Sequence, residues 1–338
     1  MDSHNIGITI PGAPSIPGLS FRAFRGEVDL PIILDLINAC KIVDQDERAD
    51  TLSDVQRNYS HLVNCDPYQD MLFAEINGQP VGYCRLYWYQ VSSDNSRIYT
   101  GAGFLHPAYR NQGLGYAIIR WSENRLRCIG AQHPRDGERY FESFANGSET
   151  GKISLLEEFG YTPQRHFYLM VRPDLENIPE ASLPAGITVR PAHPQHYRAI
   201  WDAMQEAFAD HWGFSPATEE DYRNWQESPL FQPDLWQIAW AGDQVVGTVL
   251  AFIDAPANQE YHRQRGWTEE ICVRRPWRKQ GIAKALISLS LHDLKQRRMS
   301  EAALGVDTEN LSGALRLYES MGYRSVKRNS LYRKKFAV

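Results

Sequence analysis

The sequence predicts an α+β protein built from two tandem folds, each a mixed, mostly antiparallel sheet flanked by helices. Its length of 338 residues suits two domains. A proline-rich stretch, 173–186, divides the chain into two segments of similar length that repeat the same order of elements. We therefore expect an extended arm at 1–18, a domain at 19–172, a linker at 173–186 and a second domain at 187–338.

The elements of the two halves can be aligned one by one from hydrophobic periodicity and turn residues. A strand, a turn and an amphipathic helix are predicted in 19–41 and 186–208. Two alternating strands joined by a hairpin turn follow in 70–88 and 234–252, then a strand, a glycine-containing turn and a long helix in 99–126 and 269–294, and finally a helix ending in glycine and a last strand in 155–171 and 317–336.

The composition excludes several classes of protein. A formal net charge of −5 gives no general attraction to nucleic acid or to anionic lipid. No stretch of about 18 apolar residues predicts a membrane span, and the first twenty residues do not follow the pattern of a signal peptide. The five cysteines are scattered without a C-x-x-C pair, so neither a disulfide framework nor a metal site is expected. We expect a cytoplasmic protein with no metal.

The most informative motif occurs once in each half. Residues 110–115 (RNQGLG) and 278–283 (RKQGIA) both follow a predicted strand and open a predicted helix, and they occupy the same place in the two repeats. The first backbone N–H groups of a helix have no partners within it, and the helix dipole adds partial positive charge there. Glycine lets an anion come close to the backbone. The motif therefore predicts a diphosphate site at the start of each helix.

These residues resemble the R/Q-x-x-G-x-G/A motif of the GNAT acetyltransferase superfamily, which binds the pyrophosphate of acetyl-CoA. The resemblance covers both halves, and the tandem layout resembles the two-domain proteins of the mycothiol synthase group, whose C-terminal domain is the active one. It implies acetyl-CoA as the cofactor. The implied contacts in the second half are Val273, Arg278, Lys279, Gln280, Gly281, Ile282, Ala283, Lys284 and Asn310, and those in the first half are Leu105, Arg110, Asn111, Gln112, Gly113, Leu114, Gly115 and Tyr116.

Acyl transfer from a thioester to an amine needs a base for the ammonium and an acid for the leaving thiolate. The strand before the second motif carries Glu269, at a position where the superfamily commonly has its base. Strand periodicity places Glu269 on one face with Trp267, Ile271 and Val273; a bulge would exchange the faces, so Glu270 is the alternative base. Tyr318 is the candidate acid, because a phenol of pKa near 10 suits protonation of a thiolate. The backbone N–H of Val273 is expected to polarise the thioester carbonyl.

The first half lacks both proton-transfer groups, since Gly101 and Leu156 stand where Glu269 and Tyr318 stand in the second. We therefore expect the first domain to be catalytically degenerate, as a structural or cofactor-binding partner. In the second domain, the resemblance implies that the loop after the first helix borders the acceptor. The candidate substrate residues are Asp210, His211 and Trp212; packing by the two loop aromatics is the alternative.

The function predicted from these residues is transfer of an acetyl group from acetyl-CoA to a primary amine of a small molecule, by direct transfer in the C-terminal domain. A non-catalytic acyl-CoA-binding or sensor protein and a protein N-acetyltransferase are the alternatives. We expect no nucleic-acid or membrane partner. The oligomeric state is expected to be a monomer or a weak homodimer, because a tandem repeat supplies internally the packing that single-domain relatives obtain by dimerising.

Overall fold

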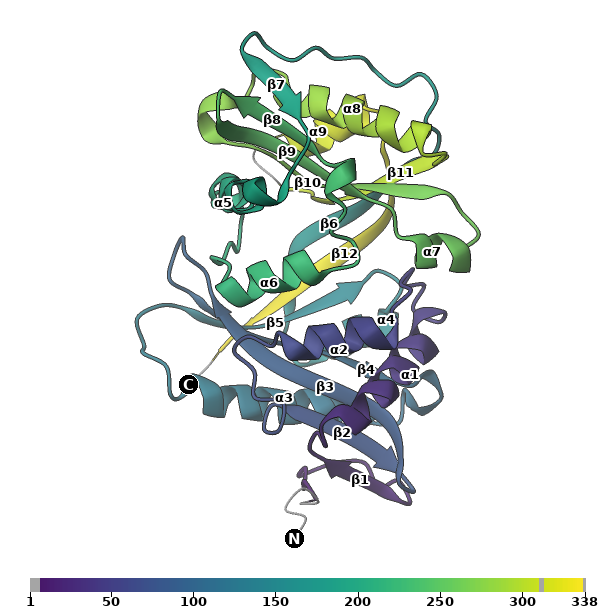
Figure 1. The fold of residues 1–338 in the computed structure, drawn as a ribbon. Helices are drawn as coiled ribbons and strands as arrows, with labels where there is room; N and C mark the ends of the chain where they lie inside the picture. Colours follow the sequence, from purple (N-terminus) through teal and green to yellow (C-terminus); the bar gives the residue numbers. More distant parts are fainter. Residues whose placement is uncertain (1–6, 310–312, 337–338) are drawn as a thin grey trace. The chain divides into compact units, whose positions relative to one another are not determined.

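The computed structural model describes residues 7–309 and 313–336, and these form two compact units. The first unit runs up to Gln164 and also includes the chain from Ser330 onward, and the second comprises Arg165–Asn329. Both are α+β folds, as the sequence predicts (Figure 1). Within the described residues, no helix combines the length and the apolar character needed to cross a membrane.

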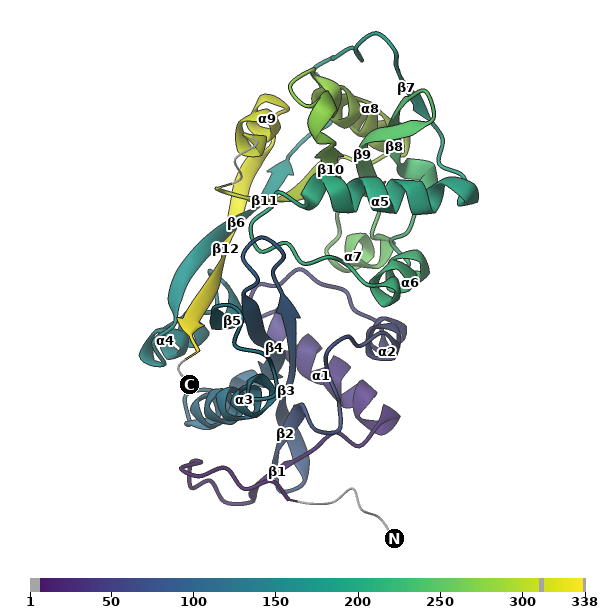
Figure 2. The same cartoon turned by 90° about the vertical axis from the view of Figure 1, so that its left-hand side faces the viewer.

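The first unit is a sheet with helices on both faces. Its strands follow the order β1-β2-β3-β4-β5, antiparallel except for the parallel pair β4–β5. Helices α1 and α2 cover one face and α3 covers the other (Figure 2). The elements are β1 Leu19–Arg22, α1 Leu30–Lys41, α2 Leu52–Ser60, β2 Met71–Ile76, β3 Gln79–Gln90, β4 Arg97–Leu105, α3 Leu114–Gly130, β5 Arg139–Asn146 and α4 Thr150–Glu158.

The second unit repeats this arrangement, with the strand order β6-β11-β10-β9-β8-β7 and one parallel pair, β10–β11. Helix α5 packs on one face and α8 on the other, each on its own apolar cluster. The elements are β6 Thr162–Arg172, β7 Ile187–Arg190, α5 Tyr197–Phe208, α6 Glu219–Glu227, β8 Gln237–Ala241, β9 Gln244–Phe252, α7 Ala255–Glu260, β10 Arg265–Val273, α8 Ile282–Gln296, β11 Glu301–Asp307, α9 Ala314–Ser320 and β12 Arg324–Lys335.

The last strand of the first repeat lies mostly in the second unit, and the last strand of the second repeat ends in the first unit. Strand β6 ends the first repeat, yet its residues 167–172 pair with β11 in the second unit. The end of β12 belongs to the first unit, where Tyr332 and Phe336 join the core and the Phe336 N–H donates to the Arg139 carbonyl (2.9 Å). The division expected at 173–186 separates the sequence repeats, and the compact units divide at 164–165 and 329–330 instead.

Three α-helices of the described residues, α2, α6 and the six-residue α7, are absent from the element order that the sequence predicts. Helices α2 and α6 each begin with a capping box, Thr51 with Asp54 and Thr218 with Asp221, in which the threonine hydroxyl accepts from the backbone and the aspartate caps in return. Both helices are short and strongly polar, so their apolar periodicity is weak. The capping boxes are the signals in the sequence that could have found them.

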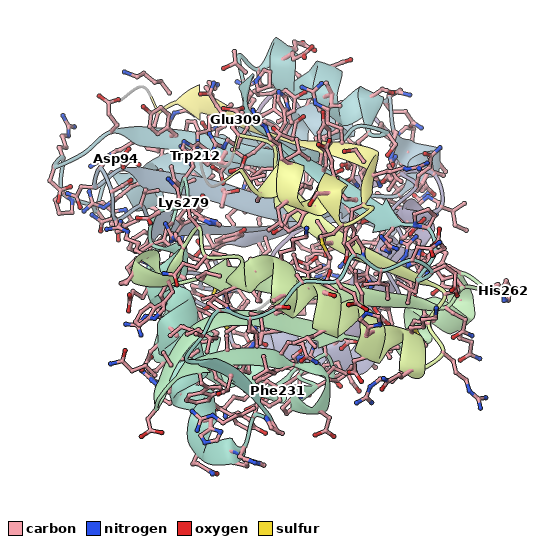
Figure 3. The ribbon with its side chains drawn as sticks, turned by 90° about the horizontal axis from the view of Figure 1, so that it is seen from above. Asp94, Trp212, Phe231, His262, Lys279 and Glu309 are labelled. Atoms are coloured by element: carbon pink, nitrogen blue, oxygen red, sulfur yellow. The ribbon has the colours of Figure 1, made fainter. Side chains whose placement is uncertain are left out.

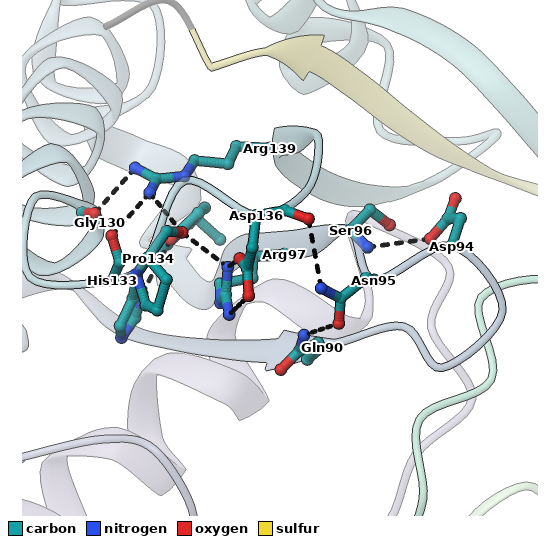
Figure 4. Close-up of polar contacts among 11 residues, drawn as sticks. Gln90, Asp94, Asn95, Ser96, Arg97, Gly130, His133, Pro134, Asp136 and Arg139 are labelled. Atoms are coloured by element: carbon teal, nitrogen blue, oxygen red, sulfur yellow. Dashed lines mark hydrogen bonds and ion pairs between the residues drawn. The ribbon is translucent and has the colours of Figure 1, made fainter.

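The arm expected to be extended at 1–18 folds back onto the first unit over its described part. Ile10 is buried, and Ile8, Ala13 and Ile16 pack on the cluster formed by α3 and the neighbouring strands. At the far end of the same sheet, Arg97 pairs with Asp136, and Arg139 donates to the carbonyls of residues 130, 133 and 134 (Figure 4). This network fixes the starts of β4 and β5.

Candidate active site

A gap opens between the two parallel strands of the second unit. Strands β10 and β11 pair only over 265–267 and 301–303. Beyond this point β10 continues against β9, while β11 continues against β6. The strand edges that face each other across the gap therefore expose backbone groups toward its interior, and side chains from both faces of the sheet can meet there. The first unit has the same feature, since β4 and β5 pair only over 97–100 and 139–142.

A β-bulge in β10 determines which side chains point to each face of the sheet beside this gap. The register of β10 shifts between Glu269 and Cys272, and Glu270 has a positive φ of 47°. Glu269 lies opposite Leu250, and Cys272 lies opposite Thr248, so both point to the face covered by α5. Ile271 and Val273 pack instead against the core under α8. The prediction that Glu269 shares a face with Ile271 and Val273 is wrong, because the bulge inserts an extra residue.

The Glu269 carboxyl spans the gap. Its Oε1 accepts a hydrogen bond from the Gly305 backbone N–H on β11 (2.9 Å). Burial raises the pKa of Glu269 to about 8, and the neighbouring charge of Glu270 adds to the rise while the Gly305 bond opposes it. Such a carboxyl accepts a proton at near-neutral pH, which suits a general base. The Glu270 side chain, by contrast, is exposed at the bulge.

Tyr318 lies on the other face of the sheet, where the charge of Glu269 acts on it. Its side chain is 7 % exposed and belongs to the core under α8, with its ring 6.3 Å from that of Tyr323. Burial raises the pKa of Tyr318, and the charge of Glu269 raises it further, so the phenol stays protonated at neutral pH. The Tyr323 hydroxyl is held by Thr268 Oγ1 (2.7 Å) in the same core. Glu269 and Tyr318 thus lie on opposite faces of the sheet.

The turn before α8 has the conformation that an anion site needs. Gly281 has a φ of +86°, and a Cβ added to it would meet nothing within 4 Å. Gln280 turns back to donate to the Pro276 carbonyl (3.2 Å), and among the described residues nothing accepts from the backbone N–H groups of 279–284. Lys279 and Lys284 stand beside this turn, and Lys279 is exposed (Figure 3). Ile282 is buried, Ala283 is half-buried, and Asn310 lies outside the described residues.

The side chains of Arg278 and Asp210 form an ion pair with each other. Arg278 Nη1 donates to Asp210 Oδ2 (2.8 Å), and its other nitrogens donate to the carbonyls of Val273 and Ala207. Asp210 also pairs with Arg275 (2.7 Å). We predicted that the Asp210 carboxylate binds a substrate ammonium and that the Arg278 guanidinium binds the diphosphate. In the structure the two groups bind each other. The first unit repeats this pair with Asp44 and Arg110 (2.8 Å), so we assign it to bracing the turn.

The other two predicted substrate residues lie on the same loop. His211 is half-buried with its ring 4.8 Å from that of Phe208, and burial lowers its pKa. Trp212 is 38 % exposed, and its ring lies 5.4 Å from the guanidinium carbon of Arg165. Arg165 in turn pairs with Asp307 at the end of β11. Nothing in the sequence pointed to Arg165 or Asp307, since their contacts depend on the exchange of β6.

The first unit does not provide the same chemistry. A Cβ at Gly101 would lie 2.6 Å from Leu86, so no side chain fits at the position of Glu269, and Leu156 is buried in the core. The turn of residues 111–116 leads into α3 as expected, with Gly113 at a φ of +84° and Leu114 buried. Pro14 of the N-terminal arm lies 3.2 Å from where a Cβ of Gly113 would stand. The turn at Gly113 is therefore in contact with the N-terminal arm, whereas a Cβ at Gly281 would meet nothing within 4 Å.

No group of three or more residues able to hold a metal ion occurs in the part of the chain that the structure describes. The gap between two parallel strands and the glycine turn at the start of α8 are features of an acyltransferase fold.

Comparison with known proteins gives the family. The acetyltransferase (GNAT) family matches residues 30–133 and 197–323, once in each repeat, and the chain belongs to this family. Its members use acetyl-CoA as the acyl donor.

Several known proteins are similar to the chain over most of its length. The chain is 28 % identical to a mycothiol acetyltransferase of Streptomyces bingchenggensis over 274 residues, covering 78 % of this chain and 80 % of that one. It is 29 % identical to a GCN5-related N-acetyltransferase from Sphaerobacter thermophilus, with a TM-score of 0.70 and coverage of 96 % and 98 %. A tandem GNAT protein from the clavulanic acid biosynthesis pathway has the same fold at 13 % identity, a TM-score of 0.64 and coverage of 95 % and 99 %.

Proposed function

We propose that this chain transfers the acetyl group of acetyl-CoA to a primary amine of a small molecule, directly and in the second repeat. The observation that carries the proposal is the Glu269 carboxyl in the gap between β10 and β11, with its raised pKa and with Tyr318 on the opposite face. Acetyl-CoA would supply the acetyl thioester.

Different residues of the second unit would bind the donor, act as base and acid, and polarise the carbonyl. The N–H groups of 279–284 would hold the diphosphate at the start of α8, with Lys279 and Lys284 adding positive charge. Glu269 takes a proton from the acceptor ammonium, so that the amine nitrogen can bond to the acetyl carbon. As the tetrahedral intermediate collapses and the carbon–sulfur bond breaks, Tyr318 donates a proton to the sulfur, and the second proton lost by the nitrogen restores the phenol. The Val273 N–H is proposed to polarise the carbonyl.

The first repeat is proposed to be catalytically inactive. Gly101 and Leu156 supply neither a base nor an acid, and Pro14 stands against its turn. We further propose a cytoplasmic location and a monomer or weak homodimer; all five cysteines are free, which fits a reducing compartment.

The acceptor class can be tested with an acetyl-CoA turnover screen, in which the release of free thiol is measured across amino sugars, aminoglycosides, amino acids and peptide N-termini. The names of the mycothiol acetyltransferase relatives make amino-sugar and amino-acid derivatives the first candidates. Tyr318→Phe should lower turnover at least about tenfold at unchanged acetyl-CoA affinity, because it removes the proton donor alone. Turnover of peptides only, or a Tyr318→Phe enzyme as fast as the parent, would contradict the proposal.

A further inference from the structure

We infer that Arg165 is a positioning residue for the acceptor side of this site, although it belongs to the first sequence repeat. It reaches the second unit through the exchanged strand β6, and there it holds the loop 209–214 beside the gap between β10 and β11. This inference deepens the proposed function and rests on it.

The contacts of Arg165 join the loop to the end of β11. Its Nε donates to Asp307 Oδ2 (3.0 Å) and its Nη1 to Glu309 Oε2 (3.2 Å), while its guanidinium carbon lies 5.4 Å from the Trp212 ring centre. The Arg165 side chain is 13 % exposed, so these partners largely enclose it. Trp212 and Glu309 are labelled on the same side of the molecule in Figure 3. A planar guanidinium suits this combination of carboxylates and a ring.

The loop is also attached on its other side. Asp210 pairs with Arg275 and Arg278, which flank the start of the turn before α8. The loop thus runs between the turn that would hold the diphosphate and the end of the strand that borders the gap. Two attachments, Asp210 and Trp212, keep His211 between them in one place.

We place the acceptor next to the loop 209–214 because the acyl donor and the base lie on opposite faces of the sheet. Direct transfer needs both substrates in the gap at once. The turn before α8 would place the acyl donor on the face that α8 covers, and Tyr318 lies on that face. Glu269 points to the opposite face, which is covered by α5 and continues into the loop 209–214. The amine that gives its proton to Glu269 therefore sits on the side of Trp212.

Loss of Arg165 should consequently weaken acceptor binding without slowing the chemistry. Arg165→Ala is expected to raise the KM for the acceptor about tenfold and to leave kcat within about twofold, as expected when an interaction is lost equally from ground and transition states. The KM for acetyl-CoA should not change, because Asp210 still braces the turn. Arg165→Lys keeps a positive charge for Asp307 and Glu309 but loses the planar contact with Trp212, so it should recover part of the loss.

A matched control is available in the same unit. Arg198 also pairs with a carboxylate, Glu219 (2.7 Å), and lies over an aromatic ring, Tyr222 (4.9 Å), but it lies at the start of α5, at the opposite end of that helix from the loop, and both partners belong to α6. Arg198→Ala should leave every kinetic constant within about twofold. The acceptor used is whichever of cysteine, glucosamine and kanamycin the parent enzyme acetylates fastest.

Hydrogen exchange provides a readout that needs no activity. The backbone amides of 209–214 should exchange faster in Arg165→Ala than in the parent or in Arg198→Ala. Unchanged hydrogen exchange in this loop would show that Arg165 does not hold the loop in place. Faster exchange with an unchanged acceptor KM, or with equal rises in the KM values for acceptor and acetyl-CoA, would overturn the acceptor role. A parent enzyme that acetylates no amine would instead overturn the proposed function.

Discussion

The raised pKa of Glu269 leads to a test by pH. If Glu269 is the base, only its deprotonated form is active, and a pKa of about 8 leaves about a tenth of the carboxyl deprotonated at pH 7 and about nine tenths at pH 9. The kcat of the parent enzyme should therefore rise about tenfold over this range. Glu269→Gln should remove the rise and lower the plateau by about 100-fold or more, as loss of a general base does.

The assay is a pH series of kcat at saturating acetyl-CoA and acceptor, with Glu270→Gln as the control. Glu270 is the adjacent carboxyl on the bulge and is exposed, so its loss reports the effect of a nearby charge alone. Glu270→Gln should keep the rise and shift its midpoint to lower pH, because a like charge that raises the pKa of Glu269 is removed. If Glu270→Gln abolishes the rise and Glu269→Gln keeps it, the assignment of the base is refuted.

The same pKa shift predicts a change in stability that does not depend on activity. The ordinary pKa of 4.5 applies in the unfolded chain, whereas the folded value is about 8. Between these values the folded protein keeps a proton that the unfolded chain has lost, so this group lowers the stability of the fold as pH rises. Glu269→Gln removes the effect. Its Tm relative to the parent should increase from pH 5 to pH 9 in thermal melts.

Three further predictions concern the turns, the core and the exchanged strand. Gly281→Ala and Gly113→Ala should each cost about 1–2 kcal/mol of stability by denaturant unfolding, because both glycines have a φ near +85°. Gly281→Ala alone should in addition raise the KM for acetyl-CoA at least about fivefold, because its Cβ enters the approach to the turn. Thr268→Val should cost about 1–3 kcal/mol, because the buried Tyr323 hydroxyl loses its partner; a thermal melt identical to the parent's would contradict this. Ending the chain at 329 should destabilise the first unit, as measured by hydrogen exchange of β5, because Tyr332 and Phe336 leave its core.

Sequence periodicity located most of the fold and part of the site. The order of strands and long helices, the two turns and the strand carrying Glu269 follow from apolar spacing and glycine placement, which are local properties. The bulge at Glu270 was foreseen only as an alternative, because one extra residue in a strand leaves no mark in composition. The pairing of Asp210 with Arg278 depends on how α5 meets a turn 68 positions later, which no local pattern encodes.

The long-range contacts of the site were the least predictable. The Gly305 N–H bonds Glu269 because β11 leaves β10 at that point, and a glycine in a strand gives no sign of such a role. Arg165 reaches Trp212 because β6 pairs with β11. Either repeat could supply a last strand of this length and polarity to either sheet, so the sequence favours neither arrangement.

The exchange of β6 and β12 has a consequence for biosynthesis. A nascent chain emerges from the ribosome N-terminus first, and a self-contained first domain could close its core while the rest is still being made. Here Tyr332 and Phe336, which belong to the core of the first unit, are translated after the second unit. The first unit must therefore wait, with part of its core unfilled, until these residues have left the ribosome, and by then the second unit has all of its strands through residue 329.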